Sequence, residues 1–255
     1  MVLDYEEGSL LVNFRNGNQN VAQKTYPVIE KIAQLRKGKG DEQQALTAVH
    51  ESGHAVAHLA LFYQAPELVL SVAAEAGSSG LAVLPSMEIL NLEKMKRRVA
   101  VLLAGLEAER LIFGEDLISA GSYGDIETAT SMVIRLLKES GFGGSSIRYA
   151  NAFSENAESY HDIPEIENLA KTILEEAQKQ AQEVVRQEEK LLLEMAAILA
   201  EHPSLLAEEV NALVKQYGSA KLKDSLLTKE LGYKELLAEK VGKLQNKLVP
   251  TYGEN

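Results

Sequence analysis

The stretch AVHESGHAV at residues 48–56 decides how the rest of the chain is interpreted, because it contains the pattern H-E-x-x-H. On a helix, residues four apart lie on one face, so His50 and His54 can bind one metal ion together. Glu51 then lies close enough to accept a proton from a metal-bound water without being a ligand. Neutral imidazole suits Zn²⁺, and a catalytic zinc keeps an open position for water beside three protein ligands. The pattern therefore predicts metal-assisted hydrolysis of a peptide bond.

The residues around this motif predict a helix that lies in a hydrophobic core. Residues 41–44 give it a polar, acidic start, and apolar residues then follow on nearly every side. The simpler alternative is a buried helix whose histidines make ordinary core hydrogen bonds. His58 would lie one turn beyond the metal, and we interpret it as a packing residue or a partner of a ligand. Burying two histidines and a glutamate is unfavourable unless something pairs with them, which a metal ion would do. Gly53 costs about 1 kcal/mol relative to Ala in mid-helix, so it indicates a close neighbour.

Composition restricts the class of protein. The chain has 255 residues, 45% hydrophobic and 25% charged, which is ordinary for a globular protein. A net charge of −11 argues against a nucleic-acid partner. There is no cysteine, so disulfides and thiolate zinc sites are excluded. Because the chain has neither a signal segment nor a run of 18 apolar residues, we expect a soluble, cytoplasmic protein without a membrane segment.

Short strands and a long helix are predicted on either side of the motif helix. Upstream, residues 9–14 favour a strand and residues 27–37 a short helix. Downstream, residues 68–72 and 81–84 favour two strands around a glycine-serine turn. Apolar residues at helical spacing then predict a helix at 92–113, which should stop at a glycine.

The second half of the chain is predicted to be helical. A glycine-rich loop is expected at 141–161, followed by one strong helix at about 165–200 that begins with capping-box spacing. Pro203 and Ser204 restart a shorter helix that runs to about Tyr217. The tail at 220–248 has Leu and Val at helical spacing among Lys and Glu, which is typical of a solvated helix or a partner-binding hairpin.

The motif leaves the third zinc ligand open. A metzincin is excluded because its ligand pattern needs Gly at 57 and His at 60, where this chain has alanines. Glu107 and Glu109, on the downstream helix, can each supply a carboxylate. Asp125, after the small-residue loop at 119–124, is the other candidate. Since Asp125 falls at the expected start of a helix over 126–139, the residues alone favour a simple N-cap.

Three motifs together resemble the peptidase domain of the FtsH-type AAA metalloproteases. They are HESGHAV at 50–56, AGLEAERLIFGE at 104–115 and SAGSYGDIETAT at 119–130, in the order and at the separations of that family. The resemblance covers about residues 41–210. It implies a mainly α fold of the α+β class: a zincin-like helical peptidase domain with a small β-sheet, followed by a helical C-terminal region.

The resemblance also implies roles for particular residues. The family's third zinc ligand matches Asp125, which joins His50 and His54, and its glutamate on the preceding helix matches Glu109, a partner that orients a ligand. The edge strand of the family's sheet holds substrate as an added strand, which explains broad sequence tolerance. The matching substrate strand consists of Leu81, Ala82, Val83 and Leu84.

The same family carries an ATPase module before its peptidase domain. This chain contains no phosphate-loop motif, so the resemblance implies an AAA ATPase partner or a module missing from the N-terminal side. It also implies a homo-oligomer, a hexamer in the family. Gly124 stands where the family usually has Asn before the ligand Asp. We expect an extension or linker at 1–40, the peptidase domain at 41–217 and a helical tail at 218–255.

The function that we expect is a zinc-dependent endopeptidase acting on extended, unfolded polypeptides. It would bind one Zn²⁺ per chain, with Glu51 as general base on a zinc-bound water. The alternative from another class is a non-catalytic assembly or adaptor domain that kept the fold. A zinc hydrolase with a non-peptide substrate also fits the motif.

Overall fold

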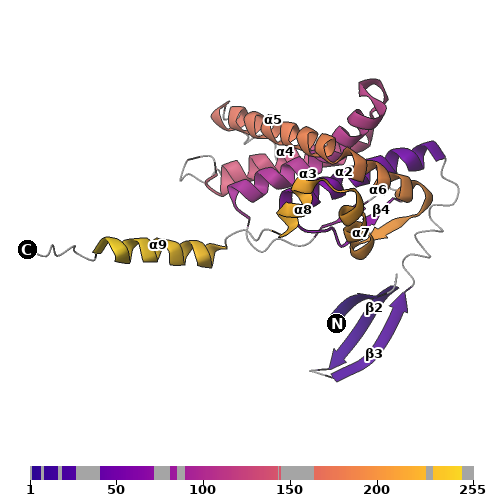
Figure 1. The fold of residues 1–255 in the computed structure, drawn as a ribbon, viewed down its shortest axis with the longest axis horizontal. Coiled ribbons are helices and arrows are strands. Elements are labelled where there is room, and N and C mark those ends of the chain that lie inside the picture. The colour runs from indigo at the N-terminus through magenta and orange to yellow at the C-terminus, as the bar shows by residue number, and fades with distance from the viewer. Residues whose placement is uncertain are drawn as a thin grey trace, which may run out of the picture.

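The computed structural model describes the backbone of residues 2–6, 9–16, 19–26, 41–71, 81–84, 90–142, 144, 164–227 and 232–248. The predicted helix at 27–37, the turn between the strands at 68–72 and 81–84, and most of the loop at 141–161 lie outside the described residues. The described part is mainly helical with small antiparallel sheets (Figure 1), so the predicted fold class is confirmed.

Two long helices form the centre of the molecule. α2 (Asp41–Phe62) carries the H-E-x-x-H motif, and α3 (Leu92–Phe113) packs along it. Because α2 is apolar on nearly every side, it is covered by α3 on one side and by α6 (Glu189–Glu201) on another. Buried residues such as Val56, Leu59 and Val99 belong to this core.

α3 has the bounds that the sequence predicts. At its start, the Asn91 side chain accepts a hydrogen bond from the Lys94 main-chain N–H at 2.8 Å. At its end, Gly114 has φ 86°, a backbone conformation that favours glycine, and its N–H donates to the Arg110 carbonyl. The predicted helix over 92–113 and its glycine stop are confirmed.

Gly53 lies where α2 and α3 approach most closely. A Cβ at this position would lie 2.5 Å from the Ala104 carbonyl oxygen and 2.6 Å from the Ala108 Cβ. The close neighbour that the sequence indicates is therefore the backbone of α3.

Replacing Gly53 with Ala should destabilise the fold by about 1–3 kcal/mol, because the added methyl forces two packed helices apart. Urea unfolding of the metal-free protein measures this cost. Gly124→Ala is the matched control, since nothing lies within 4 Å of a Cβ placed there. If Gly53→Ala is as stable as the control, the close contact between the two helices is wrong.

The next helices cover α3. α4 (Tyr123–Glu139) and α5 (Pro164–Gln187) pack on it and on each other. α5 buries a single stripe of residues at helical spacing: Ile166, Ala170, Ile173, Ala177, Ala181 and Val185.

The single helix predicted at 165–200 is wrong, because α5 and α6 are separated by a break at Glu188. The cause is a tertiary contact. The Glu188 carboxylate is buried, and it accepts hydrogen bonds from the Ser219 main-chain N–H at 2.9 Å and from the Ser219 hydroxyl. Ser219 immediately precedes α8 (Ala220–Leu227), so its hydrogen bonds to Glu188 attach this helix to the helical body.

A small sheet closes one side of the helical body. β4 (Leu68–Leu70) lies in its centre, and β5 (Leu81–Val83) and β6 (Ser204–Leu206) pair with it antiparallel. Val69 lies opposite both Ala82 and Leu205, which leaves β5 at an edge within the described strands. The two predicted strands are present, but the first ends at Leu70, because Ser71 lies outside it. The helix predicted from Pro203–Ser204 is wrong at its start, because β6 comes first and α7 (Ala207–Tyr217) follows.

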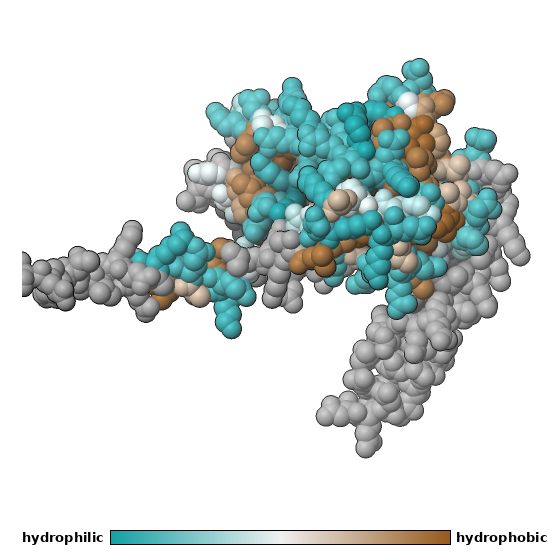
Figure 2. All heavy atoms as spheres, in the orientation of Figure 1, coloured by the Kyte–Doolittle hydropathy of each residue, from teal (hydrophilic) through white to brown (hydrophobic). Residues whose placement is uncertain are grey.

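The two ends of the chain add further elements. β1 (Val2–Glu6), β2 (Ser9–Asn16) and β3 (Gln19–Tyr26) form a separate antiparallel sheet, where the sequence predicts one strand. α9 (Tyr233–Leu248) projects from the body (Figure 1). Figure 2 shows a largely hydrophilic face of the helical body and both kinds of residue on α9. Among the helices of the described residues, none is long and apolar enough to cross a membrane.

Candidate metal centre

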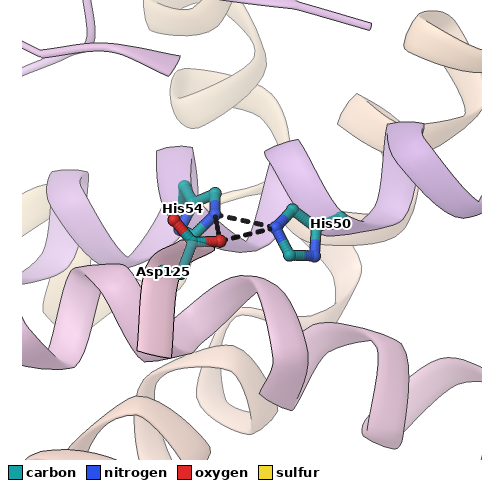
Figure 3. Close-up of side chains that lie close together, drawn as sticks. All are labelled: His50, His54 and Asp125. Carbon is teal, nitrogen blue, oxygen red and sulfur yellow. Dashed lines mark hydrogen bonds and ion pairs between the residues drawn. The ribbon is translucent and has the colours of Figure 1, made fainter. Parts of the chain in front are cut away.

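Three side chains from two helices converge beside the middle of α2 (Figure 3). His50 Nε2 lies 3.0 Å from His54 Nε2 and 3.1 Å from Asp125 Oδ2, and His54 Nε2 lies 3.3 Å from the same carboxylate oxygen. His50 and His54 are one turn apart on α2, and Asp125 comes from the first turn of α4. In the part of the chain that the structure describes, these three form the group that could hold a metal ion.

Each imidazole is oriented by its other ring nitrogen. His54 Nδ1 lies 2.7 Å from the main-chain carbonyl oxygen of Val101 on α3, to which it donates. His50 Nδ1 lies 2.7 Å from Glu109 Oε1, also on α3. Because a carbonyl and a carboxylate accept hydrogen bonds, both Nδ1 atoms carry protons and both Nε2 atoms are available to a metal.

Asp125 is not the N-cap of its helix. α4 begins at Tyr123, earlier than the predicted start at 126, and its N-cap is Ser122. The carboxylate of Asp125 therefore lies within the first turn, and it is directed at the two histidines (Figure 3). The capping role that the residues alone favour is wrong.

The two glutamates of α3 lie in different surroundings. Glu109 is 1% exposed and contacts His50 on the Nδ1 side, away from Asp125. Glu107 points elsewhere: it pairs with Arg110 and accepts a hydrogen bond from Gln178 of α5 at 2.8 Å. The structure thus brings Glu109 to His50 of the converging group and keeps Glu107 away from that group.

Gly105 of α3 provides the space in which the two imidazoles meet. A Cβ built there would lie 2.6 Å from His50 Nε2 and 2.8 Å from His54 Nε2. Any side chain would displace both rings. The sequence alone did not lead to Gly105. The signal that could have revealed it is a glycine inside a predicted helix.

His58 lies one turn beyond this group. It stacks on Phe62 with ring centroids 5.0 Å apart, and both of its ring nitrogens are buried without a hydrogen-bond partner among the described residues. Burial, and to a smaller extent the positive charge of Arg98, lowers the pKa of His58 to about 4. It is therefore a neutral packing residue at pH 7.

Charges in the group stabilise one another. Burial lowers the pKa of His50, but hydrogen bonds to Asp125 and Glu109 outweigh this effect and raise it to about 10. Burial raises the pKa of the two carboxyls, and their hydrogen bonds with the histidines outweigh it, so the pKa of Asp125 and that of Glu109 are lowered. Both carboxylates are ionised at neutral pH and favour positive charge on His50, which lies between them.

Glu51 borders an open cleft of about 500 Å³ together with the three converging side chains. It is only 5% exposed, and burial raises the pKa of its carboxyl, with the neighbouring histidines opposing this rise. A raised pKa suits a group that must accept a proton and return it near neutral pH. Ala82 and Leu84 line the same cleft, so β5 and its end border the site.

The donor set fits zinc. Two imidazole nitrogens and one carboxylate oxygen are ligands that Zn²⁺ takes in catalytic sites, and the three ligand atoms lie within 4.8 Å of one another. Because the pKa of His50 is raised, a bound zinc would displace a proton from its Nε2 atom. The partners of the Nδ1 atoms complete the arrangement that ligating histidines commonly have. A cleft on one side leaves room for water and substrate.

Comparisons with known proteins agree with this geometry. The model of peptidase family M41 matches residues 39–213. An ATP-dependent zinc metalloprotease FtsH 1 of Thermomicrobium roseum is 27% identical over 70% of this chain and 28% of its own. An FtsH of Rhodothermus marinus is 29% identical over 62% of this chain and 23% of its own length. An FtsH of Rickettsia bellii is 33% identical over 40% of this chain and 16% of its own length.

The chain thus spans less than a third of the length of these relatives. The family match, however, covers more than half of the chain and contains all the converging residues. The predicted resemblance is confirmed: with its FtsH-type peptidase domain, this chain belongs to peptidase family M41, a family of metalloproteases.

Proposed function

We propose that this chain is a zinc-dependent endopeptidase that hydrolyses extended, unfolded polypeptides. The observation that supports this most is the convergence of His50, His54 and Asp125 beside the buried Glu51. In this proposal the three converging residues hold one Zn²⁺ per chain. When bound, the zinc would lower the pKa of a water molecule and polarise the scissile carbonyl.

Glu51 moves the proton in this reaction. Its carboxylate accepts a proton from the attacking water as the new C–O bond forms at the carbonyl carbon. It then delivers this proton to the leaving nitrogen as the C–N bond breaks, which gives a carboxylate and an amine. Burial, which raises the pKa of Glu51, supports this double role because it favours the protonated form that exists between the two proton transfers.

β5 is proposed to bind the substrate as an additional strand. It lies at the edge of its sheet among the described strands, and Ala82 and Leu84 line the cleft that contains Glu51. An extended peptide paired with this edge would bring its main chain past the metal centre. Such pairing uses main-chain hydrogen bonds and therefore accepts many sequences.

Replacing Ala82 with Pro should lower the affinity for an extended peptide about tenfold, the effect of roughly one lost main-chain hydrogen bond, because the Ala82 N–H points away from β4 and toward the free edge. Zinc content should stay unchanged. Peptide binding is measured in the Glu51→Gln background, so that nothing is cleaved. Unchanged peptide affinity in a folded, zinc-loaded Ala82→Pro variant would refute the role of β5.

N-methylated peptides provide a matched test without a change in the protein. Methyl groups on alternate amides in one register should abolish strand pairing, and the same groups moved by one residue should not, because alternate amides of a strand point to opposite sides. Equal binding in both registers contradicts strand addition.

Incubation of the purified chain with an unfolded protein, with and without a chelator, tests the function as a whole. We expect cleavage without nucleotide that stops with the chelator and returns with added zinc. Zinc binding without cleavage of any polypeptide would favour the non-catalytic assembly domain or a hydrolase of non-peptide substrates. Failure to bind zinc would contradict the proposal.

The relatives are named ATP-dependent, and this chain matches less than a third of their length. We propose that an AAA ATPase, as a partner or as part of a longer chain, delivers unfolded substrate, and that the assembly is a homo-hexamer. The isolated chain should then leave stable folded proteins intact.

A further inference from the structure

Ser119, in the loop before α4, holds both oxygens of the Glu109 carboxylate. Its main-chain N–H donates to Glu109 Oε2 at 2.7 Å, and its hydroxyl donates to Glu109 Oε1 at 3.2 Å. Glu109 is 1% exposed, so these contacts replace the water that a carboxylate would otherwise bind. The loop therefore supplies the fixed partners of a buried charge.

The direction of the Ser119 hydroxyl is fixed as well. Its oxygen accepts a hydrogen bond from the Gly121 main-chain N–H at 3.1 Å, which closes a short turn over Ala120–Ser122. A Cβ on Gly121 would lie 3.0 Å from that oxygen, so a glycine eases this close approach. Because the oxygen accepts from Gly121, its proton is free to point at Glu109.

The chain of contacts continues to the metal centre. Glu109 Oε1, which receives the Ser119 hydroxyl, is also the atom that lies 2.7 Å from His50 Nδ1. A carboxylate held at both oxygens cannot rotate away from the imidazole. His50 then keeps its proton on Nδ1 and directs Nε2 toward His54 and Asp125.

We propose that Ser119 is a positioning residue of the metal centre, which acts through Glu109 to orient His50. The inference rests on the proposed function only in requiring a metal ion at His50, His54 and Asp125. It does not require cleavage of a peptide.

Zinc affinity of the full chain, measured by competition with a chromophoric chelator, tests this role. Ser119→Ala should weaken zinc about tenfold, at the lower end of the ~10–100-fold effect of outer partners of metal ligands. Ser119→Thr keeps the hydroxyl and should restore affinity to near that of the unchanged protein. Ser225→Ala is the matched control, since it removes a hydroxyl that donates to the Lys221 carbonyl at 2.8 Å, away from the metal centre.

A double-mutant cycle separates positioning from a general structural effect. In a Glu109→Ala background, Ser119→Ala should cause no further loss of zinc affinity, because the residue through which it acts is gone. The absorption spectrum of the Co²⁺-loaded protein should change in Ser119→Ala and return in Ser119→Thr. Should Ser119→Ala fail to fold, Ser119→Gly removes the same hydroxyl.

The outcomes are distinct. Unchanged zinc affinity in Ser119→Ala, or full additivity with Glu109→Ala, would overturn the inference and leave the proposed peptidase function standing. The expected pattern of zinc affinities in a protein that cleaves no polypeptide would support the inference and overturn the peptidase function.

Discussion

Replacing Glu51 with Gln is expected to leave zinc bound while peptide hydrolysis falls by at least ~10²-fold. Glutamine keeps the size and hydrogen-bonding shape of the side chain but cannot accept the proton of the attacking water. The structure supports this separation, because Glu51 lines the cleft but lies outside the group of His50, His54 and Asp125. Zinc content and the initial rate of cleavage of an unfolded protein, measured on one preparation, test it.

Glu42→Gln is the matched control for this substitution. It makes the same chemical change on the same helix, at an exposed residue that does not line the cleft. This variant should cleave at the rate of the unchanged protein. If Glu51→Gln retains most of its activity, Glu51 is not the base; if it loses zinc instead, Glu51 belongs to the metal-binding group.

Asp125→Ala is expected to weaken zinc by more than the ~10–100-fold that removal of an outer partner causes, and activity should disappear with the metal. The reason is that the carboxylate oxygen near both Nε2 atoms would supply a negatively charged ligand to the proposed zinc. Glu109→Gln should lie between the unchanged protein and Asp125→Ala, since it alters only the orientation of His50. Zinc affinity by chelator competition ranks the three proteins.

Asp116→Ala, at an exposed aspartate of the loop that follows α3, should behave like the unchanged protein. The opposite ranking of zinc affinities would change which residue is assigned as the third ligand. If Glu109→Gln removes the metal and Asp125→Ala retains it, the glutamate is the third ligand.

Local signals in the sequence predict the parts of the fold that depend on neighbouring residues. The apolar residues at helical spacing and the Gly114 stop predict the bounds of α3, and the four-residue spacing of His50 and His54 predicts their shared face. β6 was missed because three residues carry little pattern of their own, and their strand conformation depends on pairing with the distant β4.

The other misses have the same cause. The break at Glu188 depends on Ser219, and an uninterrupted helical pattern gives no sign of it. At the metal centre, the residues alone left Glu107, Glu109 and Asp125 open, and the family resemblance implied the roles now proposed. The main-chain carbonyl of Val101 and the loop contact of Ser119 could not be predicted, because each exists only once α2, α3 and the loop are packed together.

The two histidines differ in how well their orientation withstands mutation. His54 is held by the carbonyl oxygen of Val101, and every amino acid at 101 supplies that oxygen. His50 is held by a side chain, Glu109, which a single codon change can remove. In a random library, variants that fold but misplace a ligand should therefore affect His50 and carry changes at 109 or at the loop that supports it. If mutations accumulate without selection for metal binding, His50 should lose its orientation first, while His54 keeps its own.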